Sequence, residues 1–65
     1  MTTHPKPQGV PETAEFRHLN AGRYQGDYWI WQVKNQWYWQ TWSDCGEEET
    51  ERDAAIAARR QIKGE

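Results

Sequence analysis

The chain has 65 residues and a formal net charge of −2, from ten acidic and eight basic side chains. A chain this short buries only about 60% of the surface that its unfolded form exposes, which allows one small core and excludes a second domain. An enclosed catalytic cleft is not expected at this size. No run of apolar residues is long enough for a membrane span, and residues 1–10 lack the apolar segment of a secretory signal.

The apolar residues are of an unusual kind. The chain contains five tryptophans, three tyrosines and one phenylalanine, and all five tryptophans lie between Trp29 and Trp42. Few branched aliphatic residues accompany them. A core in this chain must therefore be built largely from indole rings, each of which can bury roughly 200 Å².

Residues 1–14 contain all three prolines and a single branched aliphatic residue, Val10. Such a segment cannot bury enough surface to offset the entropy of ordering it. We therefore expect a flexible or extended N-terminal arm over residues 1–14 and one folded domain over residues 15–65. An alternative is that Val10 and Pro11 pack as a strap over exposed aromatic surface.

Three segments indicate strands. Residues 15–19 alternate weakly and precede a turn at residues 20–22. Residues 28–33 and 37–42 are rich in aromatic and β-branched side chains and predict a hairpin. A three-residue loop would pair Trp31 with Trp39, and a two-residue loop at Asn35 and Gln36 would pair Trp31 with Gln40. We favour the first register because it gathers most indoles on one face of the sheet, which consists of Trp29, Trp31, Val33, Trp37 and Trp39.

The C-terminal segment predicts a helix over residues 54–63. Thr50, followed three residues later by Asp53, resembles a capping box, and Gly64 is suited to end the helix. A stripe of small residues at helical spacing lets this helix approach the large rings of the sheet closely; it consists of Ala54, Ala55, Ala58 and Ile62. The predicted fold is α+β, a two- or three-stranded antiparallel meander (β-β-β-α) with one C-terminal helix packed on one face.

Motifs for chemistry are weak throughout. His4, His18 and Cys45 lack the spacing of a metal site, so neither metal nor cofactor is expected. Cys45 cannot form an intramolecular disulfide, which fits a cytoplasmic protein, and the acidic residues 47–51 oppose a reactive thiolate there. The carboxylates of residues 47–49 are interpreted as a solvated helix start. We therefore expect a protein that is not an enzyme.

The aromatic residues suggest a binding function. One helix cannot cover both faces of a sheet, so the second face should offer an amphipathic surface of tyrosine, tryptophan and glutamine. In the favoured register its residues, with Tyr24, are the candidate binding site: Tyr24, Tyr28, Ile30, Gln32, Tyr38, Gln40 and Trp42. The expected partner is a protein, with a homodimer as one form of this.

Other partners remain open at this point. Nucleic acid also stacks on exposed aromatic rings, but the acidic balance of the chain argues against it. Carbohydrate needs no basic charge, although no spacing singles it out. The acidic strip over residues 44–53 could also attract a basic protein.

Overall fold

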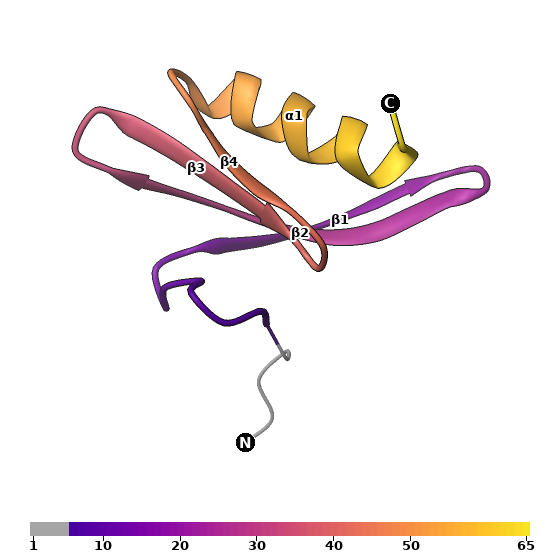
Figure 1. Cartoon of the computed structure of the whole chain (residues 1–65), viewed down its shortest axis with the longest axis horizontal. Coiled ribbons are helices and arrows are strands. Elements are labelled where there is room, and N and C mark those ends of the chain that lie inside the picture. Colours follow the sequence, from indigo (N-terminus) through magenta and orange to yellow (C-terminus); the bar gives the residue numbers. More distant parts are fainter. Residues whose placement is uncertain (1–5) are drawn as a thin grey trace.

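The computed structural model describes residues 6–65. Its elements are, in chain order, β1 (Glu15–Ala21), β2 (Tyr24–Val33), β3 (Gln36–Thr41), β4 (Cys45–Glu48) and α1 (Glu51–Lys63). The strands form one antiparallel sheet in the order β1-β2-β3-β4, and α1 lies across one face of it (Figure 1). The predicted α+β meander with a C-terminal helix is confirmed, with one strand more than expected.

The additional strand is β4, and two of its residues, Glu47 and Glu48, were expected in a solvated helix start. The chain reverses after β3 because Thr41 and Asp44 hold the turn together. The Thr41 amide donates to the Asp44 carbonyl at 2.8 Å, and the Asp44 amide donates to Thr41 Oγ1 at 3.0 Å. The glutamates that follow lie on an edge strand, where charged side chains are tolerated because they discourage pairing with another chain.

Both hairpin registers considered from the sequence are wrong. The loop between β2 and β3 consists of Lys34 and Asn35, so Val33 pairs with Gln36 and Trp31 pairs with Tyr38. Lys34 itself takes the positive φ of 56°, a conformation in which glycine or asparagine was expected. The helix face of the sheet consequently receives Ile30 opposite Trp39, rather than four indoles and a valine.

The core lies between this face and α1. Ala54 and Ala58 are fully buried in it, which confirms the predicted stripe of small residues, and Ala55 and Ile62 pack at its margin. The remaining buried members of the core come from the sheet: Leu19, Tyr28, Ile30 and Trp39. Because each of the two alanines ends at Cβ, the helix axis can come close to the rings of Tyr28 and Trp39.

Two glycines make this close packing possible from the sheet. A Cβ atom at Gly46 would lie 2.7 Å from Cζ2 of the Trp39 indole, and one at Gly26 would lie 2.8 Å from Cγ2 of Ile62. Gly46 pairs with Trp39 across β3 and β4. The indole therefore occupies the space that any side chain at position 46 would require.

Polar contacts fix the beginning and the end of α1. Thr50 Oγ1 accepts a hydrogen bond from the Asp53 amide at 3.0 Å, as the predicted cap requires, and Gly64 ends the helix with a φ of 79°.

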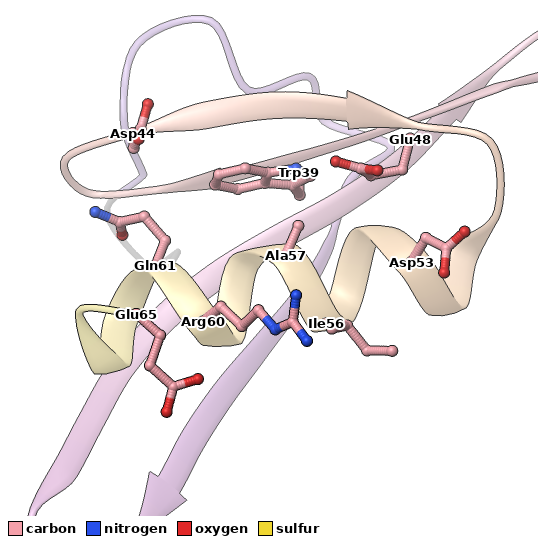
Figure 2. Close-up of a pocket in the computed structure, with 9 residues that line it drawn as sticks. All are labelled: Trp39, Asp44, Glu48, Asp53, Ile56, Ala57, Arg60, Gln61 and Glu65. Carbon is pink, nitrogen blue, oxygen red and sulfur yellow. The ribbon is translucent and has the colours of Figure 1, made fainter.

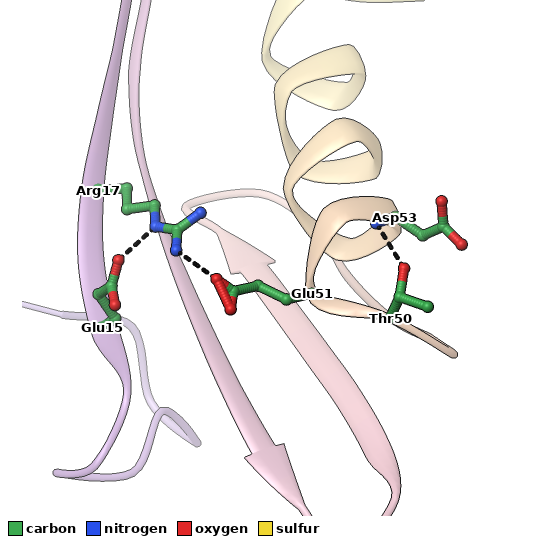
Figure 3. Close-up of polar contacts among 5 residues, drawn as sticks. All are labelled: Glu15, Arg17, Thr50, Glu51 and Asp53. Carbon is green, nitrogen blue, oxygen red and sulfur yellow. Dashed lines mark hydrogen bonds and ion pairs between the residues drawn. The ribbon is translucent and has the colours of Figure 1, made fainter.

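Arg17 on β1 donates to Glu15 and, at 3.0 Å, to Glu51 in the first helical turn (Figure 3). The hydrogen bond to Glu15, assisted by Glu51, raises the pKa of the Arg17 guanidinium. The start of the helix is thereby tied to the far edge of the sheet.

Within residues 6–65, no helix has the length and apolar character that crossing a membrane requires.

Candidate binding surface

The sheet face opposite α1, called the far face here, differs in composition from the predicted binding face. The corrected register divides the seven predicted residues between the two faces. Tyr28 and Ile30 are buried in the core beneath the helix, and Tyr24 and Gln32 alternate with them on the helix face. Tyr38, Gln40 and Trp42 lie on the far face. The prediction that these seven residues share one surface is therefore wrong.

The centre of the far face is an aromatic cluster around Trp29. The ring of Phe16 meets Trp29 edge-on with centroids 5.6 Å apart, and Trp42, which directly follows β3, meets it with centroids 5.2 Å apart and planes at 88°. Trp29 retains only 3% of its exposure, whereas Phe16 and Trp42 remain 36% and 53% exposed. Phe16 and Trp42 therefore cover Trp29, while one side of each of these two rings stays exposed to solvent.

Residues 6–14 of the predicted N-terminal arm lie on this same side of the sheet (Figure 1). Val10 is buried to 7% exposure, and the Val10 and Ala14 amides donate to the Pro7 and Pro11 carbonyls. Val10 is thus the buried residue of this segment, and residues 1–5 of the predicted arm lie outside the described residues. Lys6 Nζ donates to Glu12 Oε1 at 2.8 Å, which lowers the pKa of the Glu12 carboxyl from its ordinary value of 4.5.

One part of the far face remains open. Trp31 and Tyr38 form a cross-strand pair whose rings stack with centroids 5.7 Å apart and planes 16° apart, and both side chains are half-buried. Val33, the next residue of β2 on this face, is 50% exposed. We call Trp31, Val33 and Tyr38 the open patch. Its two rings are held rigidly against each other, so little side-chain entropy would be lost when a partner covers them.

A shallow hollow of about 250 Å³ adjoins the open patch on β4. It is lined by Trp31, Tyr38 and Trp39 together with Cys45, Gly46 and Glu47 of β4. Cys45 is an exposed free thiol. The hollow gives the patch a concave margin with a reactive group that can report whether the patch is covered.

The polar groups at the other end of the far face satisfy one another. His18 Nδ1 lies 2.7 Å from Asp27 Oδ1, across the β1–β2 pair, and Trp42 Nε1 donates to Asp27 Oδ2 at 3.3 Å. In the part of the chain that the structure describes, no group of three or more His, Cys, Asp or Glu side chains could hold a metal ion. His18 is therefore described by its contact with its cross-strand neighbour Asp27.

Sequence reasoning missed Phe16, Trp31 and Val33 as members of this surface. It assigned Trp31 and Val33 to the buried face, because the loop was taken as three residues. The signal that could have corrected this is Ile30, the only branched aliphatic residue near the middle of β2. If Ile30 is placed in the core, alternation along the strand sends Trp29, Trp31 and Val33 to the opposite face.

No protein-family model, curated protein or solved structure is significantly similar to this chain.

Proposed function

We propose that this chain is a non-enzymatic binding module that acts by protein–protein contact through the open patch, and that its partner is a second copy of itself. The observation that carries the proposal is the Trp31–Tyr38 stack, which lies half-exposed beside Val33 on the face that α1 leaves uncovered. Partly solvent-exposed aromatic residues are enriched at the centres of protein–protein interfaces.

The shape of the molecule supports a second copy as the occupant. The chain is a slab whose extents are 34 × 33 × 16 Å. Its broad face is of the size that a stable interface needs, about 800 Å² from each partner. Two copies in contact through their open patches would give a four-layer α/β/β/α arrangement.

The small size of the core also supports a second copy as the partner. Among the described residues only Ala54 and Ala58 have no exposed surface, and no large side chain is completely buried. If a second copy covered Trp31, Val33 and Tyr38, buried apolar residues would lie on both faces of the sheet. Association of this kind stabilises a marginal domain by mass action.

Sedimentation velocity over a range of concentrations tests the proposal. We expect a monomer–dimer equilibrium, and Val33→Lys should weaken it at least about tenfold because a two-fold interface contains each substitution twice. Ile56→Lys is the matched control, since Ile56 is a 38% exposed apolar residue of α1, on the helix layer and away from the far face. The dimer should also slow alkylation of Cys45, which lines the adjoining hollow.

A single monomeric species up to about 1 mM, the concentration at which an interaction of about 4 kcal/mol half-fills the dimer, would refute self-association. Equal weakening by Val33→Lys and Ile56→Lys would also refute the proposed surface, because it would move the contact away from the open patch.

A further inference from the structure

A second concave surface lies on the helix side of the molecule, between β4 and α1. It is a groove of about 420 Å³. Figure 2 shows the Trp39 indole lying between the strand and the helix, with Ala57 beneath it. Glu48 reaches the groove from β4 and Asp53 lies beside it on the first turn of the helix, while Asp44 lines it from the turn before β4 with its carboxylate directed away from the helix. The groove therefore has an aromatic and aliphatic floor with carboxylates around its rim.

The charge of this groove is unbalanced. Asp44, Glu48, Asp53 and Glu65 line it together with one cation, Arg60. None of the four carboxylates forms an ion pair with another residue between positions 6 and 65. The helix dipole accounts for Asp53 in the first turn, but it does not account for Glu48 or Glu65. The groove thus presents an electrostatic environment that attracts a cation.

The floor of the groove contains an unsatisfied donor. Trp39 is 8% exposed, and its Nε1 is a buried nitrogen without a hydrogen-bond partner. Figure 2 shows this nitrogen at the end of the ring nearest Glu48. A buried donor without a partner is costly, by about 1–3 kcal/mol, and most indole N–H groups in protein interiors have an acceptor. The groove therefore lacks an acceptor at its floor and has too few cations at its rim to balance its carboxylates.

The strand beside the groove has an unpaired edge. β4 is the last strand of the sheet and pairs with β3 alone. The outward backbone groups of such a strand can accept an extended segment of another chain. A segment lying there would run along the mouth of the groove and would bring both main-chain carbonyls and side chains to it.

From these observations we propose that the groove between β4 and α1 binds an extended, arginine-containing peptide segment of another protein. A peptide carbonyl would accept from Trp39 Nε1 once the Glu48 side chain swings outward, and the guanidinium groups would pair with Glu48 and Asp53. A simple cation meets only the second need, and a neutral peptide meets only the first. This site is independent of the open patch, which lies on the other face of the sheet.

The test is a titration of the full chain, labelled with ¹⁵N, with a capped peptide of alternating alanine and arginine. In an extended strand, alternate side chains point to the same side, so the arginines of this peptide can face the groove together. We expect the indole N–H resonance of Trp39 to move saturably, and added salt to weaken the binding because the rim contacts are screened. A peptide with citrulline in place of arginine, which keeps the shape and removes the charge, should bind much more weakly.

Two adjacent glutamates provide matched variants. Glu48→Gln removes a carboxylate from the groove, while Glu47→Gln makes the same change one residue away on the opposite face of β4. Glu48→Gln should weaken peptide binding about two- to fivefold, the effect of losing one partly exposed ion pair. Glu47→Gln should leave the affinity nearly unchanged. Both side chains lie outside the buried core, and circular dichroism verifies that each variant is folded.

Three results would overturn the proposal. The first is a Trp39 indole resonance that stays in place while the peptide saturates other signals. The second is an equal loss of affinity in Glu47→Gln and Glu48→Gln, which would mean attraction by net charge alone. The third is equal binding of the citrulline peptide. None of these outcomes bears on self-association through the open patch.

Discussion

The two faces of the sheet both carry large aromatic residues, but they bury them in different ways. On the helix face, Trp39 is enclosed by groups that have almost no side chain, namely Gly46 on β4 and the alanines of α1. On the far face, Trp29 is enclosed by the rings of Phe16 and Trp42, while Trp31 stays half-open. An indole in so short a chain is therefore buried in one of two ways. Small neighbours allow the backbone to approach it closely, or other aromatic rings pack around it.

Truncation of one tryptophan on each face gives the largest expected contrast. Trp39→Ala should cost about 3–5 kcal/mol, comparable to the whole stability of a domain of this size, because it removes the centre of the core. Trp31→Ala should cost about 1–2 kcal/mol or less, since the side chain is half-exposed already. Urea denaturation followed by circular dichroism at monomer concentrations measures both losses.

Similar losses for the two variants would contradict the distinction between the faces. If Trp39→Ala does not fold, Trp39→Phe provides a milder truncation at the same position, and it should still destabilise the chain more than Trp31→Phe does.

The next contrast concerns the glycines that face the helix layer. Gly46→Ala should destabilise the fold by about 1–3 kcal/mol, because the new methyl group would overlap the rigid, enclosed indole of Trp39. Gly26→Ala places a methyl group equally close to Cγ2 of Ile62, but Ile62 lies at the partly buried margin of the core and can shift more easily than the enclosed indole. In thermal denaturation, Gly46→Ala should therefore have a lower melting temperature than Gly26→Ala. The reverse order of melting temperatures would contradict this account of the packing.

Much of the helical half of the fold could be predicted from the sequence, because its signals are local. Thr50 and Gly64 mark the ends of α1 within a residue or two, and the spacing of Ala54 and Ala58 identifies its buried stripe. Each of these signals depends only on neighbours within a few positions along the chain. Such signals do not require knowledge of the partner surface.

The sheet was harder to predict because its sidedness depends on a single loop. With tryptophans at positions 29, 31, 37 and 39, alternation alone fits more than one pairing, and a shift of one residue moves every side chain to the other face. The decisive conformation is the positive φ of Lys34, which no residue preference indicates. The candidate site inherited this error, since four of its seven residues lie on the helix face.

β4 was missed for a related reason. Its sequence, Cys-Gly-Glu-Glu, lacks the apolar alternation of a strand, because Gly46 must leave space for Trp39 and the glutamates lie at the sheet edge. A glycine such as Gly46, whose role is to let the Trp39 indole pack against the backbone, adds nothing to the hydrophobic pattern of its strand. The groove that β4 forms with α1 was therefore invisible from the sequence, although its acidic residues were noticed.

The arm provides a smaller contrast within the far face. Val10→Ala should destabilise the fold by about 1.5 kcal/mol, the effect of removing two buried methyl groups. Val33→Ala makes the same chemical change on the same face, at a side chain that is 50% exposed, and should have little effect on a monomer. Equal destabilisation by the two variants would show that the arm does not contribute to stability.

The smallest expected effect is the pH dependence of the contact within the arm. Lys6 lowers the pKa of Glu12 below its ordinary 4.5, chiefly through their hydrogen bond and also through its charge. Since the folded-state pKa is the lower one, the stabilising contribution is present above the ordinary value and disappears as the pH falls through the folded-state value. A titration of the Glu12 carboxyl followed by ¹³C NMR should give a midpoint below 4.5, and Lys6→Met should move it upward. An unchanged midpoint in Lys6→Met would mean that Lys6 does not hold Glu12 in solution, and the arm would then rest on the burial of Val10 alone.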